Sequence, residues 1–228
     1  MTHGSYQVMA QTTPTRRKDR VNYDRLAAHA VLDEAVVCHV GFVIDGQPVV
    51  LPQLHARVGD QLYLHGSSGA RALRAARNGG LAVCVTVTLV DGLVLARSAF
   101  NHSINYRSVV IHGTAEEVTD ESAKQAALAS LVDAVVPGRS AAVRGPSRKE
   151  LEATTVLRLP LENVSVKIRT GPPADDEPDL ELPYWAGVLP LSSVPGTPEP
   201  APDLLASIPA PAHITGWVRA THEARSLS

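Results

Sequence analysis

One short segment of the chain combines residue types that could bind an anion. His65-Gly66-Ser67-Ser68-Gly69-Ala70-Arg71-Ala72-Leu73-Arg74 follows an alternating strand pattern and opens a helical one. The first turn of a helix presents unpaired N–H groups and the positive end of the helix dipole. The Ser67 and Ser68 hydroxyls and the Arg71 guanidinium would add donors, so a phosphate fits this segment. A capped helix with solvent-facing arginines would give the same pattern, and the spacing matches neither a Walker loop nor a nucleophile elbow.

A second polar segment, residues 97–108, lies between two predicted strands, where loops often carry function. A solvated connection is the alternative. Histidines are also frequent, but they show no His-x-x-x-His spacing and no interleaved carboxylates, so we predict no dedicated metal site. A haem held by one histidine needs no such spacing. The histidines of the predicted strands and loops are His39, His55, His65, His102 and His112.

Short strands joined by turns must position these segments. Apolar or alternating runs cover residues 35–44, 49–55, 61–65, 81–90, 93–100, 107–118 and 164–169. Asp45-Gly46 and Asp91-Gly92 are strong hairpin signals between such runs. The pattern predicts a mainly β fold, an antiparallel sheet closed as a barrel or sandwich with flanking helices.

Helices are predicted over residues 22–32 with Asn22 as the cap, over 68–78, over 120–136 and, more briefly, from Ser147. In the helix over 120–136 the apolar residues recur at i, i+3, i+4 and i+7, the spacing of one helix face. These residues are Leu128, Leu131, Val132 and Val135.

Composition divides the chain into three parts. Residues 1–20 are polar and basic and are predicted to form a mobile N-terminal arm, while residues 21–170 form the folded domain. Residues 171–228 form a Pro-rich C-terminal arm, because eleven of the 17 prolines lie between Pro172 and Pro211. The apolar segment 184–191 (YWAGVLPL) within this arm needs a surface to dock on, either the chain's own barrel or a second subunit.

Charge and composition exclude several classes of protein. The formal net charge of -2 argues against nucleic acid or a membrane surface as partner. No apolar run reaches about 18 residues, and no secretory signal follows the basic N-terminal residues. The two cysteines lie in apolar runs and suggest free thiols. We therefore expect a cytoplasmic protein.

Three segments resemble the pyridoxamine 5'-phosphate oxidase-like, flavin-nucleotide-binding split-barrel family, and within it the branch of nitroimidazole-resistance reductases. They are residues 45–75, which begin DGQPVVLPQLHARVGDQLYLHGSSG, residues 81–120, which begin LAVCVTVTLVDGLVLARSAFNHS, and residues 184–191. The resemblance implies a six-stranded antiparallel FMN-binding split barrel. It also implies a homodimer with the flavin at the subunit interface.

The resemblance assigns roles to single residues. The segment 51–54 would lie along the isoalloxazine, the loop 67–71 would bind the phosphate, and Trp185 would reach the partner subunit's flavin. His65 is the implied catalytic residue, a proton donor or orienting group near the flavin. The implied cofactor-binding residues are Leu51, Pro52, Gln53, Leu54, Ser67, Ser68, Arg71, Arg107, Ser108 and Trp185.

The function expected from the resemblance is an FMN-binding oxidoreductase that reduces a small molecule such as a nitro-aromatic or quinone-like acceptor. An Arg-x-His-x-Arg-like signature is absent after Trp185, which argues against true pyridoxamine-phosphate oxidation. Two alternatives remain open. One is a non-catalytic flavin- or haem-binding split-barrel protein. The other is a deazaflavin-dependent reductase, in which Arg97, Arg107 and Lys167 would hold the longer acidic tail.

Overall fold

The structure is a computed structural model of the 228-residue chain and describes residues 4–76, 79–205 and 208–217. Its strands are β1 (Val21–Asn22), β2 (Val37–Ile44), β3 (Gln47–Val58), β4 (Gln61–Ser67), β5 (Leu81–Leu95), β6 (Ser103–Glu117), β7 (Thr154–Pro160), β8 (Asn163–Arg169) and β9 (Gly187–Pro190). Its α-helices are α1 (Arg25–Glu34), α2 (Arg71–Ala76), α3 (Glu121–Val135), α4 (Arg148–Ala153) and α5 (Ala212–Thr215). Short 3₁₀ helices are η1 (Ala10–Thr12), η2 (Lys18–Arg20), η3 (Ala99–Asn101), η4 (Ser140–Ala142) and η5 (Glu177–Asp179).

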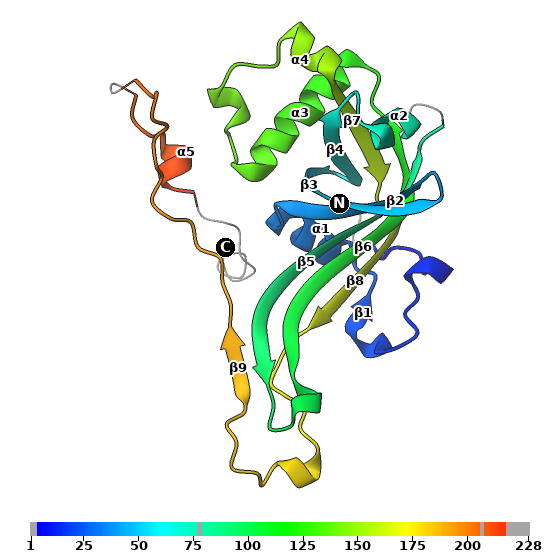
Figure 1. The fold of residues 1–228 in the computed structure, drawn as a ribbon, viewed down its shortest axis with the longest axis vertical. Coiled ribbons are helices and arrows are strands. Elements are labelled where there is room, and N and C mark those ends of the chain that lie inside the picture. The colour runs from blue at the N-terminus through cyan, green and yellow to red at the C-terminus, as the bar shows by residue number, and fades with distance from the viewer. Residues whose placement is uncertain (1–3, 77–78, 206–207, 218–228) are drawn as a thin grey trace.

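The strands form one antiparallel sheet in the order β1-β8-β6-β7-β4-β3-β2-β5-β9. Six of these strands follow one another in the order β6-β7-β4-β3-β2-β5. A further pairing of β5 with β6 joins the last of the six to the first. The link between β6 and β7 is short, through Glu116↔Arg158 and Glu117↔Leu157. The arrangement is consistent with a split β-barrel and confirms the predicted mainly β fold (Figure 1).

Alternating burial places one face of the long strands in a shared hydrophobic core. In β5 every second residue from Leu81 to Val87 is buried, the period of two of a strand with one buried face. α1 packs against the same core through Ala28, Val31 and Leu32. The cap of this helix is Asp24, two residues after the predicted cap Asn22, because the Asp24 carboxylate accepts the Ala27 N–H at 2.7 Å.

β5 and β6 extend beyond the barrel as a long hairpin (Figure 1). The predicted turn at Asp91-Gly92 is wrong, because β5 continues through it with a register shift between Val90 and Gly92. Two long-range contacts hold these residues in the strand. Asp91 accepts hydrogen bonds from Arg107 of β6, and Gly92 pairs with Pro190 of β9. The connection between β5 and β6 lies instead at residues 96–102.

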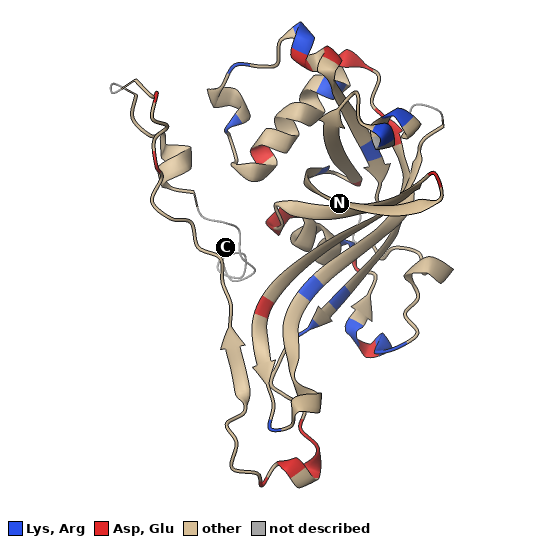
Figure 2. Ribbon diagram, in the orientation of Figure 1, with Lys and Arg blue, Asp and Glu red and all other residues tan. Residues whose placement is uncertain are grey.

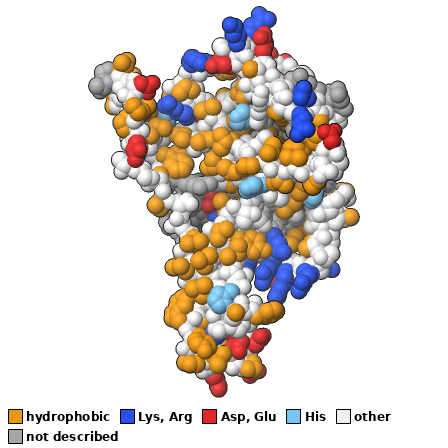
Figure 3. Space-filling model, in the orientation of Figure 1, with side chains coloured by type: hydrophobic (Ala, Val, Ile, Leu, Met, Phe, Trp, Pro, Cys, Tyr) orange, Lys and Arg blue, Asp and Glu red, His pale blue; other side chains and the backbone are white. Residues whose placement is uncertain are grey.

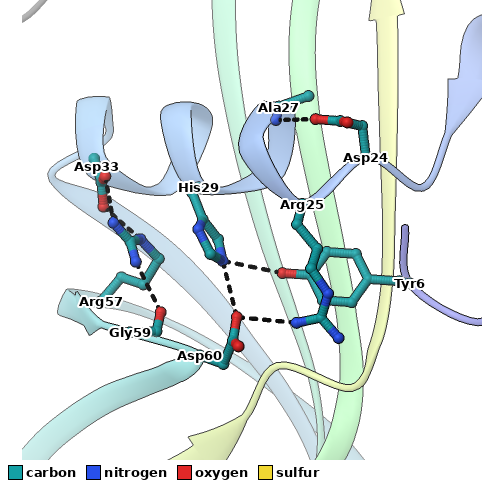
Figure 4. A network of polar contacts seen from close by, with 9 residues as sticks. All are labelled: Tyr6, Asp24, Arg25, Ala27, His29, Asp33, Arg57, Gly59 and Asp60. Atoms are coloured by element: carbon teal, nitrogen blue, oxygen red, sulfur yellow. Dashed lines mark hydrogen bonds and ion pairs between the residues drawn. The ribbon is translucent and has the colours of Figure 1, made fainter. Parts of the chain in front are cut away.

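Two buried side chains, Tyr6 and Thr12, attach the N-terminal segment to the barrel, within the residues 1–20 that were expected to form a mobile arm. Tyr6 is only 3% exposed and belongs to the core, and its N–H donates to the Tyr23 carbonyl at 2.8 Å. The Tyr6 hydroxyl also joins a polar network with His29 and Asp60 (Figure 4). These partners are distant in sequence, which is why a polar composition alone suggested a free segment. Residues 1–3 lie outside the described residues.

The chain after β8 forms the extended arm that the prolines predicted. Asp175 fixes its start to the tip of the β5–β6 hairpin by accepting the Arg97 N–H at 2.9 Å and its guanidinium at 2.8 Å. β9 then pairs along β5, and the chain beyond it leaves the barrel (Figure 1). Between residues 191 and 217 the charged residues are Glu199 and Asp203 (Figure 2). No helix within the described ranges combines the length and apolarity needed to cross a bilayer.

Candidate functional site

The sheet opens where β3 and β4 part. Their register ends at His55↔Leu64, after which residues 47–54 pair with β2 and β4 continues along β7. Leu54 and His65 are therefore the first residues past the divergence, one on each lip of the opening. The pairings of the described strands leave the second edge of segment 51–54 unpaired. Main-chain groups on such an edge are available to a ligand. We call this opening the β3–β4 split.

The loop after β4 keeps the donors of the predicted anion site, although its helix is shorter than predicted. α2 begins at Arg71, because the preceding serines are still tied to the sheet and loop. The Ser68 N–H donates to the Ala153 carbonyl at 2.9 Å, and Ser67 Oγ accepts the Gly69 N–H at 3.3 Å. The exposed Arg71 guanidinium lies 3.8 Å from the Asp45 carboxylate. A pair this long and exposed binds weakly, so Arg71 remains available to an anion.

His65 lies on the β4 lip, on the opposite face from the buried Leu62 and Leu64. Its Nδ1 is enclosed without a hydrogen-bond partner, and Nε2 has none among the described residues either. Burial lowers the pKa of the imidazole because it disfavours the charged form. The ring is therefore neutral near pH 7 and can exchange a proton or ligate a metal.

A cavity of about 650 Å³ opens beside this lip, with Leu54 and His65 in its wall. We call it the α3 cavity, because α3 and the chain that follows it supply most of its lining. Figure 3 shows hydrophobic side chains gathered on this face of the molecule, with histidine among them. The apolar lining from α3 and the following chain consists of Leu128, Ala129, Leu131, Val132, Val135, Val136 and Val143.

The predicted apolar stripe of α3 thus faces the α3 cavity. All four of its residues are in the wall, but of the four only Leu131 is buried. Helical spacing of apolar residues identifies the inward face of a helix, but it does not distinguish a packed core from the wall of an open cavity. The stripe was the sequence signal for this cavity, although its spacing predicted only one apolar face of the helix.

Two arginines belong to the same wall. Arg144 forms a bidentate pair with Glu150, both contacts at 2.7 Å, and this pair holds the pKa of the Glu150 carboxyl well below its usual range. Arg139 has no side-chain partner within the described ranges. The wall therefore combines an apolar surface, a neutral imidazole and an unpaired guanidinium. This combination suits a largely apolar ligand that carries an acidic group.

Three of the predicted flavin-binding residues have their contacts elsewhere in the chain. Arg107 donates to Glu34 and Asp91, and Ser108 donates to the Lys167 carbonyl at 3.3 Å. Trp185 is exposed, and its ring lies against Gly187. Within one copy of the chain these contacts do not bring the three residues to the β3–β4 split. The other predicted residues, on segments 51–54 and 65–71, lie along its two lips.

Comparison with known families identifies the fold's relatives. Residues 24–168, which include both lips of the split, match the family described as pyridoxamine 5'-phosphate oxidase. The chain belongs to this family. The predicted resemblance is therefore confirmed, while a comparison with curated proteins gave no match.

Two solved structures are similar over nearly the whole chain. The flavocytochrome Anf3 from Azotobacter vinelandii is 40% identical, with a TM-score of 0.86 over 92% of this chain and 97% of that one. An FAD- and haem-binding protein from Mycobacterium smegmatis is also 40% identical, with a TM-score of 0.82 over 86% of this chain and 96% of that one.

A more distant structure, named for 5-nitroimidazole antibiotic resistance, comes from Bacteroides thetaiotaomicron. It is 22% identical, with a TM-score of 0.54 over 65% of this chain and 86% of that one. This likeness concerns the fold alone. The comparisons therefore support a flavin-binding fold. The likeness to the nitroimidazole-resistance structure does not identify a substrate for this chain.

Proposed function

We propose that the chain is a flavin-dependent oxidoreductase that acts on a small molecule as a homodimer. The observation that carries the proposal is the β3–β4 split. It places the segment expected to contact the flavin ring, 51–54, on one lip and the expected phosphate-binding residues Ser67 and Ser68 on the other. The two 40% identical structures, whose names state a flavocytochrome and an FAD- and haem-binding protein, support a flavin cofactor.

The residues of the split fit such a group. A bound flavin would supply hydride and single-electron transfer. The unpaired main-chain groups of 51–54 would orient its ring, and Arg71 with the two serines would hold its phosphate. While no metal is bound to its Nε2, His65 would hold or deliver a proton at that nitrogen. The apolar wall beside it would exclude water from the reacting groups.

The homodimer is part of the proposal because one copy leaves the expected site incomplete. Arg107, Ser108 and Trp185 have their contacts away from the split, so a second copy would have to supply its exposed Trp185 and the surface around the other two residues. β2 and β3 also present exposed apolar side chains, including Val43 and Val50, that a second copy would cover. The stretch 191–217 of the arm, in which Glu199 and Asp203 are the charged residues, would contribute to the same interface.

The identity of the cofactors is the finer part of the proposal. The sequence predicts FMN, whereas one 40% identical structure is named for FAD, and the names of both include haem or cytochrome. We therefore include haem as a second cofactor. A deazaflavin has less support, because two of the three basic residues available for its tail, Arg97 and Arg107, are already paired with carboxylates.

The test is the absorption spectrum of the purified full-length chain, followed by mass spectrometry of the released cofactor. Flavin bands are expected, and FMN or FAD is then identified by its mass. Anaerobic reduction and re-oxidation by nitro-aromatic and quinone acceptors would establish turnover. A chain that retains flavin but is not re-oxidised by any acceptor would support the non-catalytic alternative. A purified chain that binds neither FMN nor FAD would overturn the proposal.

A further inference from the structure

The wall of the α3 cavity carries apolar surface that a flavin on the β3–β4 split does not account for. Val132 and Val143, which lie outside both lips of the split, are 39% and 42% exposed, and both line this cavity. Single exposed apolar residues are common on protein surfaces. Their convergence on one concavity of about 650 Å³ is typical of a small-molecule site, because such sites occupy about 300–1,000 Å³.

The polar groups of the wall restrict the chemistry of the ligand. Apart from the Arg144–Glu150 pair, they include the unpartnered imidazole of His65 and the unpartnered guanidinium of Arg139. In the described part of the chain, no three His, Cys, Asp or Glu side chains group together as metal ligands. A bare metal ion would therefore lack ligands here. A metalloporphyrin brings its own equatorial nitrogens and requires one axial histidine from the protein.

We propose that the α3 cavity binds haem, with His65 as its axial ligand and Arg139 paired with a propionate carboxylate. The inference rests on the proposed function, in which haem is the second cofactor, and it assigns the site. Nε2 is the ligating atom, because Nδ1 is enclosed while Nε2 is not. The apolar side chains of α3 then pack against the face and edge of the macrocycle.

Arg139 is chosen over Arg144 because of its partners. The Arg144 guanidinium is already bound in bidentate fashion by Glu150, with both contacts at 2.7 Å. Recruiting it would break that pair, whereas Arg139 has no pair to break. A charge-assisted hydrogen bond contributes about 1.5–3 kcal/mol, so loss of Arg139 weakens the binding of a carboxylate ligand by about ten- to a hundred-fold.

The axial ligand is tested by titrating the full-length chain and its His65→Ala variant with ferric haem. The wild type is expected to give a sharp Soret band with the resonance Raman and EPR signatures of histidine ligation. His65→Ala is expected to lose these signatures and to regain them with added imidazole. His102→Ala is the matched control, because His102 is exposed and bonded to the Ser98 carbonyl. Unchanged ligation in His65→Ala would overturn the assignment.

The cavity and the carboxylate contact have separate tests. Val132→Trp should fill the cavity and abolish haem binding, whereas Ala126→Trp, at an exposed position of α3 outside the wall, should not. Arg139→Ala should weaken the binding of iron protoporphyrin about ten-fold or more and leave that of its dimethyl ester unchanged. Equal weakening of the binding of both porphyrins would show that Arg139 does not contact a propionate. Haem binding unaffected by Val132→Trp would show that haem does not bind in the α3 cavity.

Flavin content is measured on every variant, so that the two proposals fail separately. A chain that keeps flavin but shows no histidine-ligated haem overturns the haem site and leaves the flavin proposal standing. A chain that binds haem through His65 but does not bind flavin overturns the proposed function and supports the haem site.

Discussion

At the scale of single residues, the two arginines expected to contact the flavin differ in what already holds them. Arg71 is 74% exposed and has one loose contact with Asp45. Arg107 is largely buried and donates to both Glu34 and Asp91, and these hydrogen bonds raise its pKa. A guanidinium with two carboxylate partners is committed to the fold, whereas an exposed one is free to bind a ligand.

Arg71→Ala is expected to weaken flavin binding by about 1.5–3 kcal/mol, the contribution of a charge-assisted hydrogen bond. The variant should unfold at the wild-type denaturant midpoint, because an exposed pair of this kind contributes little to stability. Flavin titration by fluorescence measures the first effect. Arg74→Ala, an exposed residue of the same helix, is the control. Wild-type affinity in Arg71→Ala would remove Arg71 from the site.

Arg107→Ala should instead destabilise the fold by about 2–4 kcal/mol, since it deprives two partly buried carboxylates of a shared cation. Denaturant unfolding is the measurement. Arg148→Ala breaks an exposed pair with Glu152 and should change the free energy of unfolding by less than about 0.5 kcal/mol. A loss of flavin binding at unchanged stability would show instead that Arg107 has the flavin role implied by the resemblance.

Tyr6 makes the stability of the fold depend on pH. Its ring lies under the Arg25 guanidinium, and its hydroxyl is 3.2 Å from Nε2 of His29 (Figure 4). Burial raises the pKa of the phenol from 10.0 to about 12. A raised folded-state pKa means that the folded chain binds the proton more tightly than the unfolded chain. The stabilisation is therefore complete below about pH 10 and is lost as the pH rises to about 12.

The expected loss is about 2–3 kcal/mol of unfolding free energy across that window. It is measured as the difference between wild type and Tyr6→Phe, so that other groups titrating in the same range cancel. Tyr184→Phe, at an exposed tyrosine, should retain the wild-type pH dependence. Parallel curves for wild type and Tyr6→Phe between pH 10 and 12 would contradict the assignment.

At the scale of elements, local signals predicted the strands and helices where their partners are adjacent in sequence. Asp45-Gly46 joins β2 to β3 as predicted, and both residues adopt positive φ. Asp91-Gly92 carries the same dipeptide, but Arg107 and β9 hold it in an extended strand. The same limit applies to the site. Motifs identified the loop 65–71, whereas the α3 cavity requires the packing of α3 beside β3 and β4, and Arg139 gave no sequence signal.

β9 lies close against β5 at Gly92, and replacement of this glycine should detach β9. A Cβ at this position would lie 3.1 Å from the Leu189 carbonyl oxygen and 3.1 Å from the Val188 side chain. Gly92→Val is therefore expected to abolish amide hydrogen-exchange protection over residues 187–189. The pairing of β5 with β6 is on the other edge and should persist. Gly196→Val, which meets nothing within 4 Å, is the control, and retained protection in Gly92→Val would contradict the close approach.

At the scale of the whole molecule, the arm and the barrel surface are two apolar surfaces that one copy leaves uncovered. Val194 and Ile208 on the arm are 81% and 51% exposed, as is Val50 of β3 at 63%. The start of the arm is nevertheless fixed, since the Asp175 carboxylate is 1% exposed and bound by Arg97. An arm anchored at one end that exposes apolar side chains such as Val194 and Ile208 is suited to lie across a second copy of the chain.

The double variant Val194→Asp with Ile208→Asp should therefore weaken the dimer at least ten-fold without unfolding the barrel, because both side chains are exposed in the single chain. Introducing a charge into a desolvated interface costs several kcal/mol, whereas on a free surface it costs little. Sedimentation velocity over a range of concentrations measures the dimer dissociation constant, with Ser193→Asp as the matched control.

If the arm carries Trp185 to the partner's split, flavin occupancy should fall together with the fraction of dimer. A stable dimer in the double variant would place the interface elsewhere, and a monomeric wild type that retains flavin would show that one copy completes the site.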